Sequence, residues 1–279
     1  ERLRSIQLKI ETIKEHLIEI KPRSATVTQV ETVHTYEMIA QVRQKSLDER
    51  PIDSDTVCSY DTYDAALKAV GAGLAAIDGI RAGAFERAFC AVRPPGHHAT
   101  PTQSMGFCLF NNIAVTARYA QQQGYAKVMI IDFDVHHGNG TQDAFYDDDT
   151  VFYFSSHQAF AYPGTGAEHH CGRGQGEGYT ANYLLMPESG DEEILDIYKE
   201  DLSKHYAFFQ PDIVLVSAGY DLHESDPLAQ LNVTTEGIRD IVRNILDLGD
   251  TPVVFMLEGG YSVYDLGWNV VATVEEMFV

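Results

Sequence analysis

Basic residues are scarce in this 279-residue chain, and the shortage excludes one group of partners. The chain has 20 Lys and Arg against 41 Asp and Glu, which gives a formal net charge of −21 at pH 7. A field of this sign repels DNA, RNA and anionic membrane surfaces, so we expect the chain itself to bind neither nucleic acid nor membrane. The charge favours a cationic substrate, although a solubilising acidic surface explains it equally well.

Paired cysteines and long apolar runs are missing as well. The four cysteines (Cys58, Cys90, Cys108 and Cys171) show no Cys-x-x-Cys spacing, which argues against a zinc knuckle and a disulfide framework. The sequence contains no run of 18 apolar residues and no visible signal peptide, so we predict a cytoplasmic protein. Residues 172–176 match the dinucleotide pattern Gly-x-Gly-x-x-Gly only loosely and follow no strand, so we discount dinucleotide binding.

What is present is an alternation of short apolar runs with longer amphipathic segments. The short runs predict buried strands, and apolar side chains at helical spacing predict helices. We expect strands at 89–92, 128–131, 151–154, 213–216 and 253–257, helices at 1–20, 62–83, 113–123, 194–209 and 235–248, partial helix at 30–42, and loops at 47–61 and 164–178. This order predicts an α/β protein: a single domain over residues 1–279, with a doubly wound parallel sheet flanked by helices.

Residues 128–141 join a predicted core strand to a series of polar side chains. The apolar start, Val-Met-Ile-Ile, is followed by Asp132, Asp134 and His136 at every second position. Such side chains point the same way in extended backbone, and ligands of open α/β sheets bind at the carboxyl ends of strands. A core strand has no structural need for two carboxylates and an imidazole at its end. The pattern therefore predicts a metal site.

Asp221 follows another predicted strand and completes a ligand set for that metal. A catalytic zinc ion takes three protein ligands and keeps one position open for water. Asp134, His136 and Asp221 supply three such ligands, and their two negative charges balance the ion. A metal held in this way lowers the pKa of its water and polarises a carbonyl group.

Two further strand-end loops carry groups that suit a hydrolase. His97 and His98 fit the base and the acid of a hydrolysis near neutral pH. Asp132 is placed to hold a ring nitrogen of one histidine, and Tyr261, on a Gly-Gly turn, to hydrogen-bond a developing oxyanion. We interpret the lone His34 as structural.

Six motifs follow one another over most of the chain. They are Arg-Pro-Pro-Gly-His-His-Ala (93–99), Gly-Phe-Cys-Leu-Phe-Asn-Asn (106–112), Asp-Phe-Asp-Val-His-His-Gly-Asn-Gly-Thr (132–141), Pro-Gly-Thr-Gly (163–166), Ser-Ala-Gly-Tyr-Asp with Asp-Pro-Leu (217–221 and 226–228), and Glu-Gly-Gly-Tyr (258–261). With these motifs the chain resembles the histone deacetylase family, in particular its class II and bacterial branches, which are related to the acetylpolyamine amidohydrolases. The resemblance implies the arginase-deacetylase fold and zinc-dependent amide hydrolysis. The opening Glu-Arg-Leu resembles the tail of the family's His-Pro-Glu-x-Pro-x-Arg-Leu segment, so we expect that the first strand of the domain is missing from this sequence.

The resemblance also implies roles for individual residues. The zinc ligands and the catalytic residues are those singled out above: Asp134, His136, Asp221, His97, His98, Asp132 (as partner of His97) and Tyr261. Phe107 is implied as one wall of a narrow acyl-lysine tunnel, with the Gly106 carbonyl near the substrate amide. Tyr162, where the family often has Phe, is implied as the opposite wall. An inner potassium site is implied on Asp132 and Ser155, with the backbone carbonyls of Asp134 and His136.

Two positions differ within the family and bear on activity and substrate. Asn139 stands where one branch has an Asp that supports the second histidine; Asn is usual in the class II and bacterial branches, so we expect activity with a different basicity of His98. Leu228 stands where the polyamine-selective class II enzyme has a Glu, which favours acyl-lysine in a protein or peptide as the substrate.

Other functions stay open at this point. An acetylpolyamine amidohydrolase is the alternative substrate assignment, and residues 48–61 form an acidic loop that bears on it. An arginase-like ureohydrolase needs a two-metal cluster, and we find one complete ligand set only. A non-catalytic acyl-lysine binding protein predicts the loss of Tyr261, a histidine or a ligand, and none is lost. The sequence leaves the oligomeric state open.

Overall fold

Six parallel strands form one sheet in the computed structural model, which describes residues 1–278. Their order across the sheet is β1-β6-β5-β2-β3-β4. The strands are β1 (Arg87–Cys90), β2 (Val128–Asp132), β3 (Val151–Gln158), β4 (Thr180–Leu185), β5 (Ile213–Ala218) and β6 (Val253–Leu257). Parallel neighbours need crossover connections, and here helices provide most of them on both faces of the sheet. This arrangement confirms the predicted α/β fold class.

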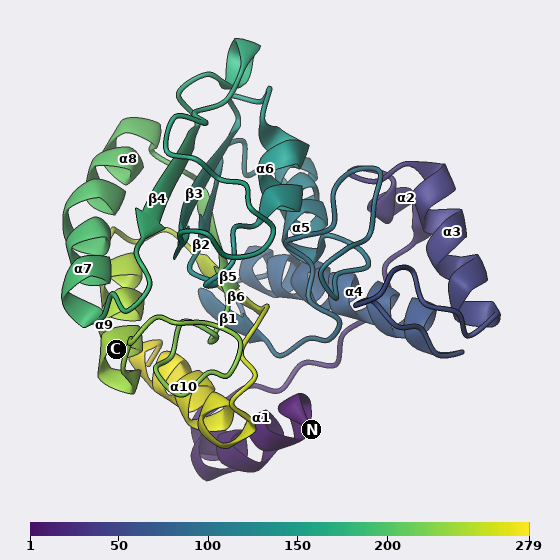
Figure 1. The fold of residues 1–279 in the computed structure, drawn as a ribbon, viewed down its shortest axis with the longest axis horizontal. Helices are drawn as coiled ribbons and strands as arrows, with labels where there is room; N and C mark the ends of the chain where they lie inside the picture. Colours follow the sequence, from purple (N-terminus) through teal and green to yellow (C-terminus); the bar gives the residue numbers. More distant parts are fainter. Residues whose placement is uncertain (279) are drawn as a thin grey trace.

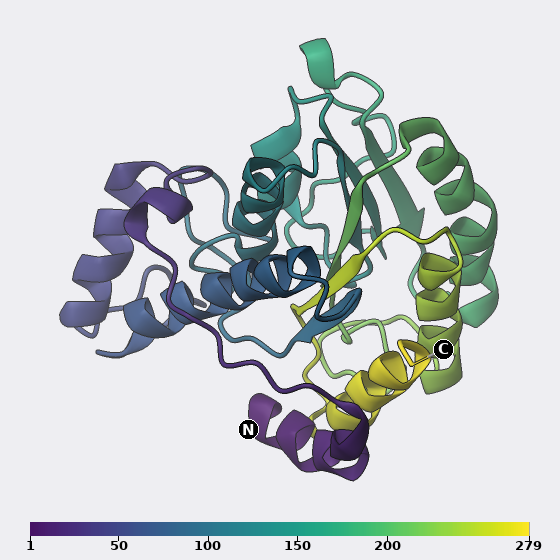
Figure 2. The same ribbon diagram turned by 180° about the vertical axis from the view of Figure 1, so that it is seen from behind.

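Helices cover the two faces in separate groups (Figures 1 and 2). α4 (Thr62–Arg81), α5 (Asn112–Gln122) and α6 (Asn139–Phe145) lie on one side, with α2 (Val27–Val30) and α3 (Tyr36–Leu47) outside them. α7 (Asp191–Asp196), α8 (Leu202–Phe209), α9 (Thr235–Leu246) and α10 (Val263–Glu276) lie on the other, and α1 (Arg2–Ile10) packs against α10. A 3₁₀ turn at Glu11–His16, another at Gly174–Gly176 and a π-helical turn at Ile197–Asp201 complete the elements.

The central strands are apolar because both of their faces are covered. All residues of β2, β5 and β6 are buried, as expected for parallel strands between two layers of helices. The strands also end in register: Asp132 on β2 pairs with Ser155 on β3 and Ser217 on β5. Polar side chains that end neighbouring strands are therefore brought together at one edge of the sheet.

Helix α4 approaches its neighbours closely, which explains its glycines. A Cβ atom added to Gly73 would lie 2.0 Å from Thr116 Oγ1 on α5, and one added to Gly71 would lie 1.6 Å from the carbonyl oxygen of Arg23. Only glycine allows this separation, and it lets α4 and α5 lie side by side against the sheet.

Several elements differ from the prediction. β1 is Arg87–Cys90 rather than 89–92, and the predicted helix at 1–20 is α1 followed by the 3₁₀ turn that ends at His16. The sequence reading missed β4, α6 and α10. β4 is an edge strand with alternating and partly exposed side chains, so it lacks the continuous apolar run used as the strand signal. No helix in the described part of the chain combines the length and hydropathy needed to cross a bilayer.

Candidate active site

The predicted metal ligands converge at the carboxyl ends of β2 and β5. His136 Nδ1 lies 3.1 Å from Asp134 Oδ1 and 3.2 Å from Asp221 Oδ2. Both carboxylates are fully buried, and the three ligand atoms all lie within 4.8 Å of one another. Zinc bonds of about 2.0 Å in tetrahedral geometry place ligand atoms about 3.3 Å apart. The donor set and its spacing therefore fit a zinc ion.

Backbone amides hold both carboxylates in this orientation. Asp134 Oδ2 accepts from the N–H of Gly259 (2.7 Å), and Asp221 Oδ1 accepts from the N–H of Val135 (3.0 Å). A Cβ added to Gly259 would lie 2.0 Å from Asp221 Oδ2 and 2.6 Å from Asp134 Oδ2. The Gly-Gly turn after β6 thus lies too close to the two carboxylates for any side chain at Gly259, and its N–H orients Oδ2 of Asp134.

His97 contacts carboxylates on both sides of its ring. Its Nδ1 lies 3.1 Å from Asp132 Oδ2, which also accepts from the hydroxyl of Tyr153 at 3.1 Å. His97 Nε2 lies 3.8 Å from Asp134 Oδ2. Burial alone disfavours the imidazolium, but Asp134 and Asp132 outweigh burial and raise the pKa of His97 to about 10. These two carboxylates therefore favour a proton on both nitrogens of the ring.

His98 lies beside it, with ring centroids 4.0 Å apart, but has a neutral partner. Its Nδ1–H donates to the amide oxygen of Asn139 at 2.9 Å. Burial and the positive charge of His97 lower the pKa of His98 well below its ordinary value. The ring is therefore neutral, and its Nε2 is free to accept a proton.

Tyr261 is held from its backbone. Asp226 Oδ2 accepts from the N–H groups of Tyr261 (2.5 Å) and Ser262 (3.2 Å). The guanidinium of Arg2 lies 5.1 Å from the centroid of the Tyr261 ring. Burial, together with the charges of Asp221 and Asp134, raises the pKa of Tyr261 far above its ordinary value, so the phenol keeps its proton and can donate a hydrogen bond.

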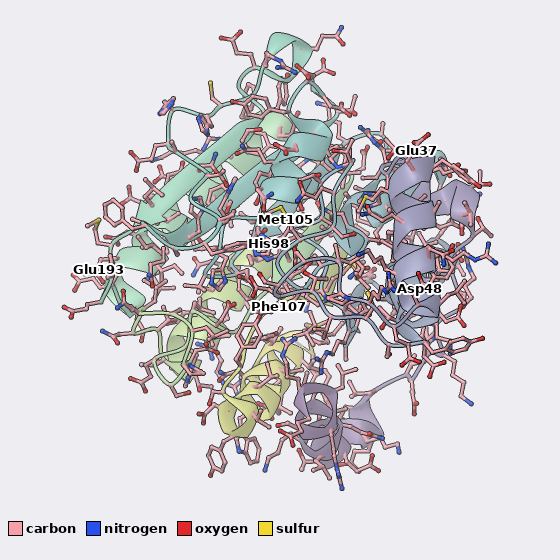
Figure 3. All side chains as sticks on the ribbon, turned by 45° about the vertical axis from the view of Figure 1, so that its right-hand side comes forward. Glu37, Asp48, His98, Met105, Phe107 and Glu193 are labelled. Carbon is pink, nitrogen blue, oxygen red and sulfur yellow. The ribbon has the colours of Figure 1, made fainter. Side chains whose placement is uncertain are left out.

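Aromatic side chains flank these groups. The Phe107 ring lies 5.9 Å from that of Tyr261, and the Tyr162 ring meets that of His98 edge-on at 5.0 Å. A Cβ on Gly106 would lie 2.6 Å from the His98 ring and 2.9 Å from that of Tyr162, so this position requires glycine. In Figure 3 the labels of His98 and Phe107 lie close together near the middle of the view, away from Glu37 and Asp48 on the α3 side.

The outer ends of this group are open to solvent. Phe107 is 42% exposed and Tyr162 is 44% exposed. Leu228 is 54% exposed, and its N–H donates to Asp226 Oδ1 at 3.0 Å, so one aspartate holds both the Leu228 loop and the Tyr261 turn.

Comparison with known proteins decides the family. The chain matches the histone deacetylase domain over residues 1–277. It belongs to the histone deacetylase family. A probable deacetylase of Archaeoglobus fulgidus is 38% identical over 253 residues, which cover 89% of this chain and 70% of that protein. Histone deacetylase 14 (chloroplastic) of Arabidopsis thaliana is 41% identical over 267 residues, covering 89% of this chain and 63% of that protein.

Other relatives agree with this membership. Histone deacetylase 10 (chloroplastic) of rice, Oryza sativa subsp. japonica, is 46% identical over 228 residues, covering 78% of this chain and 52% of that protein. The crystal structure of the HDA15 HD domain superimposes with a TM-score of 0.95 at 35% identity, covering 99% of this chain and 80% of that one. The chain thus has the arginase-deacetylase fold of the histone deacetylases and belongs to a family of deacetylase hydrolases, while it spans only part of the length of these relatives.

Four residues support the histone deacetylase site without having been assigned a role from the sequence: Arg2, Tyr153, Asp226 and Glu258. Glu258 directly follows β6, and its Oε2 accepts from the N–H groups of Gly96 (2.6 Å) and His97 (3.1 Å). Its burial raises its pKa to about 7. The sequence could have indicated Glu258, because it is a carboxylate at the end of a core strand, the same pattern that identified Asp132. Arg2 donates to the carbonyl oxygens of Glu258 and Gly260, both at 2.6 Å, and the sequence carried no sign of this contact.

His34 is structural in this fold. Its Nδ1–H donates to the carbonyl oxygen of Thr100 (2.9 Å), and its Nε2 accepts from the N–H of Asn111 (2.8 Å). The histidine therefore ties the segment before α3 to the start of α5.

Proposed function

We propose that this histone deacetylase-family chain is a zinc-dependent deacetylase that hydrolyses the amide of N-acyl-lysine side chains in proteins or peptides. The observation that carries the proposal is the convergence of Asp134, His136 and Asp221 beside His98, with the Tyr162 ring against His98 and His136. A zinc ion held by these three residues would polarise the substrate carbonyl group and activate a water molecule.

The remaining groups transfer protons or stabilise negative charge during hydrolysis. His98 Nε2 accepts a proton from the attacking water and returns it to the amine as the C–N bond breaks, because its ring is neutral and its Nδ1–H is anchored on Asn139. His97 keeps its proton and stabilises negative charge beside the reacting carbon. The Tyr261 hydroxyl donates to the carbonyl oxygen as that oxygen becomes negative.

An acetylpolyamine is the second candidate substrate, on a specific observation. Asp53 lies near the outer wall, because its Oδ1 accepts from the N–H of Thr56 (2.7 Å) and the Thr56 hydroxyl accepts from the N–H of Phe107 (3.2 Å). Burial raises the pKa of Tyr162 to about 12, and the charges of Asp53 and Asp55 add to the shift. A carboxylate near the entrance suits the second ammonium group of a polyamine. The exposed Leu228 offers no such charge, which supports the peptide substrate. A non-catalytic acyl-lysine binding protein is the weaker alternative, because every group named above is in place.

Three earlier expectations remain proposals. Asp132 and Ser155 pair in the register of β2 and β3, which supports an inner potassium ion, although Ser155 Oγ contacts His157 Nδ1 at 2.9 Å. A cytoplasmic location is a prediction from composition alone. A single domain over residues 1–279 is supported by the single sheet, and Val279 lies outside the described residues.

The test is a rate comparison on purified protein loaded with one zinc equivalent. An acetyl-lysine peptide and N-acetylated putrescine or spermidine are compared at matched concentrations, with metal-free protein as the control. We expect zinc-dependent turnover with a higher kcat/KM for the peptide. A higher kcat/KM for the polyamine would agree with zinc-dependent deacetylation but would overturn the proposed peptide substrate. Absence of turnover with either substrate, at full zinc occupancy, would overturn the proposed deacetylase.

A further inference from the structure

A second set of metal-binding side chains lies beside the candidate zinc site. His97, Cys108 and Glu258 come from three separate loops, after β1, before α5 and after β6. Their ligand atoms lie within 4.8 Å of one another, and at most 3% of any of the three residues is exposed. The catalytic roles proposed above use His97 but neither Cys108 nor the carboxylate of Glu258.

We propose that His97, Cys108 and Glu258 form a second, inhibitory site for one divalent ion of the zinc and cadmium class. The inhibitory part of this inference rests on the proposed deacetylase function. An imidazole nitrogen, a thiolate and a carboxylate are a ligand set that zinc and cadmium accept, whereas magnesium and calcium prefer oxygen ligands alone.

Charge favours a cation at this position. Four carboxylates are buried at this end of the sheet, with no more than 1% of any of them exposed: Asp132, Asp134, Asp221 and Glu258. One ion on the first site balances two of them. The Glu258 carboxylate accepts hydrogen bonds from two backbone amides and from the Ser217 hydroxyl (3.3 Å), all neutral donors. The nearby guanidinium of Arg2 donates to the Glu258 backbone carbonyl and not to its carboxylate.

Binding exchanges two protons for the ion. The bond from the metal to Cys108 Sγ forms as the S–H bond breaks, and the bond to a ring nitrogen of His97 forms as that N–H bond breaks. Both protons leave to solvent, so no oxidant or reductant is needed. The carboxylate of Glu258 then faces a cation instead of neutral donors, which lowers the cost of burying its charge.

Inhibition follows from the use of His97 as a ligand. A ring nitrogen of His97 that binds metal no longer carries a proton beside the reacting carbon. Cys108 and Glu258 are fully buried, so an ion reaches them only as the surrounding loops open. We therefore expect inhibition to develop slowly.

The experiment adds cadmium to protein that already holds one zinc equivalent. Three quantities are followed: bound metal per chain by equilibrium dialysis, the ultraviolet charge-transfer absorption of a cadmium–thiolate bond, and deacetylation rate with time. The first site has no sulfur ligand, so cadmium that exchanges into it gives no thiolate absorption. We expect an additional equivalent of metal, a new absorption band and a slow loss of rate.

Cys108→Ser and Cys108→Ala are the test variants, and the other three free thiols supply matched controls. Cys90 is buried, Cys58 is partly exposed and Cys171 is exposed, so single serine variants at these positions report thiolate binding elsewhere. We expect the Cys108 variants to keep their zinc-dependent deacetylation rate and to lose the cadmium–thiolate absorption band. Half-inhibition should need at least about tenfold more cadmium than in the unaltered chain. The three controls should behave as the unaltered chain.

Two results would overturn the second site: no additional cadmium–thiolate bond in the unaltered chain, or the same band and the same inhibition in both Cys108 variants. Failure of the proposed function is a separate outcome. A zinc-loaded chain without deacetylase activity would still bind the additional cadmium through Cys108, because dialysis and absorption do not depend on turnover.

Discussion

Two neighbouring histidines differ in charge because their hydrogen-bond partners differ. His97 donates to the carboxylate of Asp132 and is held as a cation, whereas His98 donates to the neutral amide oxygen of Asn139. The first arrangement stabilises negative charge, and the second leaves Nε2 of His98 free for proton transfer. The sequence does not indicate this difference in protonation, because in it the two histidines are simply adjacent.

Replacement of His98 by Ala or of Tyr261 by Phe tests this division of roles. Each change removes one proton donor or acceptor of the reaction, so we expect kcat to fall by about 10² to 10⁴. Neither side chain is a metal ligand, so both variants should still bind one zinc equivalent. Metal content by atomic absorption and deacetylation rate on an acetyl-lysine peptide are the measurements.

The chain offers matched controls for both substitutions. Tyr264 is 78% exposed three residues after Tyr261, and His169 is exposed on the loop before Cys171. Tyr264→Phe and His169→Ala should leave kcat and zinc content unchanged. Near-normal turnover of His98→Ala or Tyr261→Phe would show that our role for that residue is wrong.

For individual residues, the sequence predicted which side chains lie together, but it did not predict all of the hydrogen bonds that orient them. Alternation along β2 placed Asp132, Asp134 and His136 on one side of a strand end, and this is a local property of extended backbone. The contact of Gly259 N–H with Asp134 spans 125 positions, and that of Arg2 with Gly260 spans 258. Such contacts depend on the packing of distant loops, and no local pattern encodes them.

Among the elements, prediction succeeded where burial was complete. β2, β5 and β6 are covered on both faces, so their apolar runs are continuous and recognisable. β4 lies at the sheet edge with mixed burial, and α6 is only seven residues long and begins three residues after His136. Tertiary contacts determine these two elements more than secondary-structure propensity does, so the hydrophobic pattern alone did not predict them.

The turn after β6 leaves no room for a side chain at Gly259. A Cβ on Gly259 would overlap Oδ2 of Asp221, a proposed metal-binding oxygen, and Oδ2 of Asp134. We expect Gly259→Ala to displace both carboxylates and to weaken zinc binding by about 10- to 100-fold, as changes around metal ligands typically do. The measurement is zinc affinity by competition with a chromogenic chelator.

Gly190→Ala is a suitable control for that variant. Gly190 precedes α7, and its added Cβ would lie at an ordinary contact distance, 3.4 Å from the carbonyl oxygen of Asn232. Zinc affinity of the Gly190 variant should equal that of the unaltered chain. An unchanged zinc affinity of Gly259→Ala would show that the turn moves away from the ligands at little cost.

For the molecule as a whole, acidity restricts partners more than it identifies them. The net charge of −21 is spread over a chain whose active-site carboxylates are buried, so the solvent-facing acidic residues set the surrounding field. Such a field attracts cationic peptides and polyamines alike and discourages contact with nucleic acid. We therefore expect substrate choice to depend on short-range contacts at Phe107, Tyr162 and Leu228, because sequence-wide charge does not separate the two candidate substrates.

The stability of the whole fold should depend on one buried histidine in mildly acidic solution. Burial lowers the pKa of His34 to about 4, and its Nε2 accepts a hydrogen bond that a protonated ring could not accept. The unfolded chain therefore binds one more proton than the folded chain between pH 6.5 and about 4. Stability from this group is complete above pH 6.5 and falls as the pH drops through that window, by about 2.5 kcal/mol at pH 4.5.

The variant His34→Gln separates this contribution from that of the acidic residues. It is less stable than the unaltered chain at pH 7, because it does not reproduce both hydrogen bonds, but it has no group to protonate. The difference in free energy of unfolding, from urea titrations at pH 7 and pH 4.5, should therefore shrink by about 2.5 kcal/mol on acidification. A difference that stays constant between the two pH values would mean that His34 titrates alike in the folded and unfolded chain, contrary to its burial between Thr100 and Asn111.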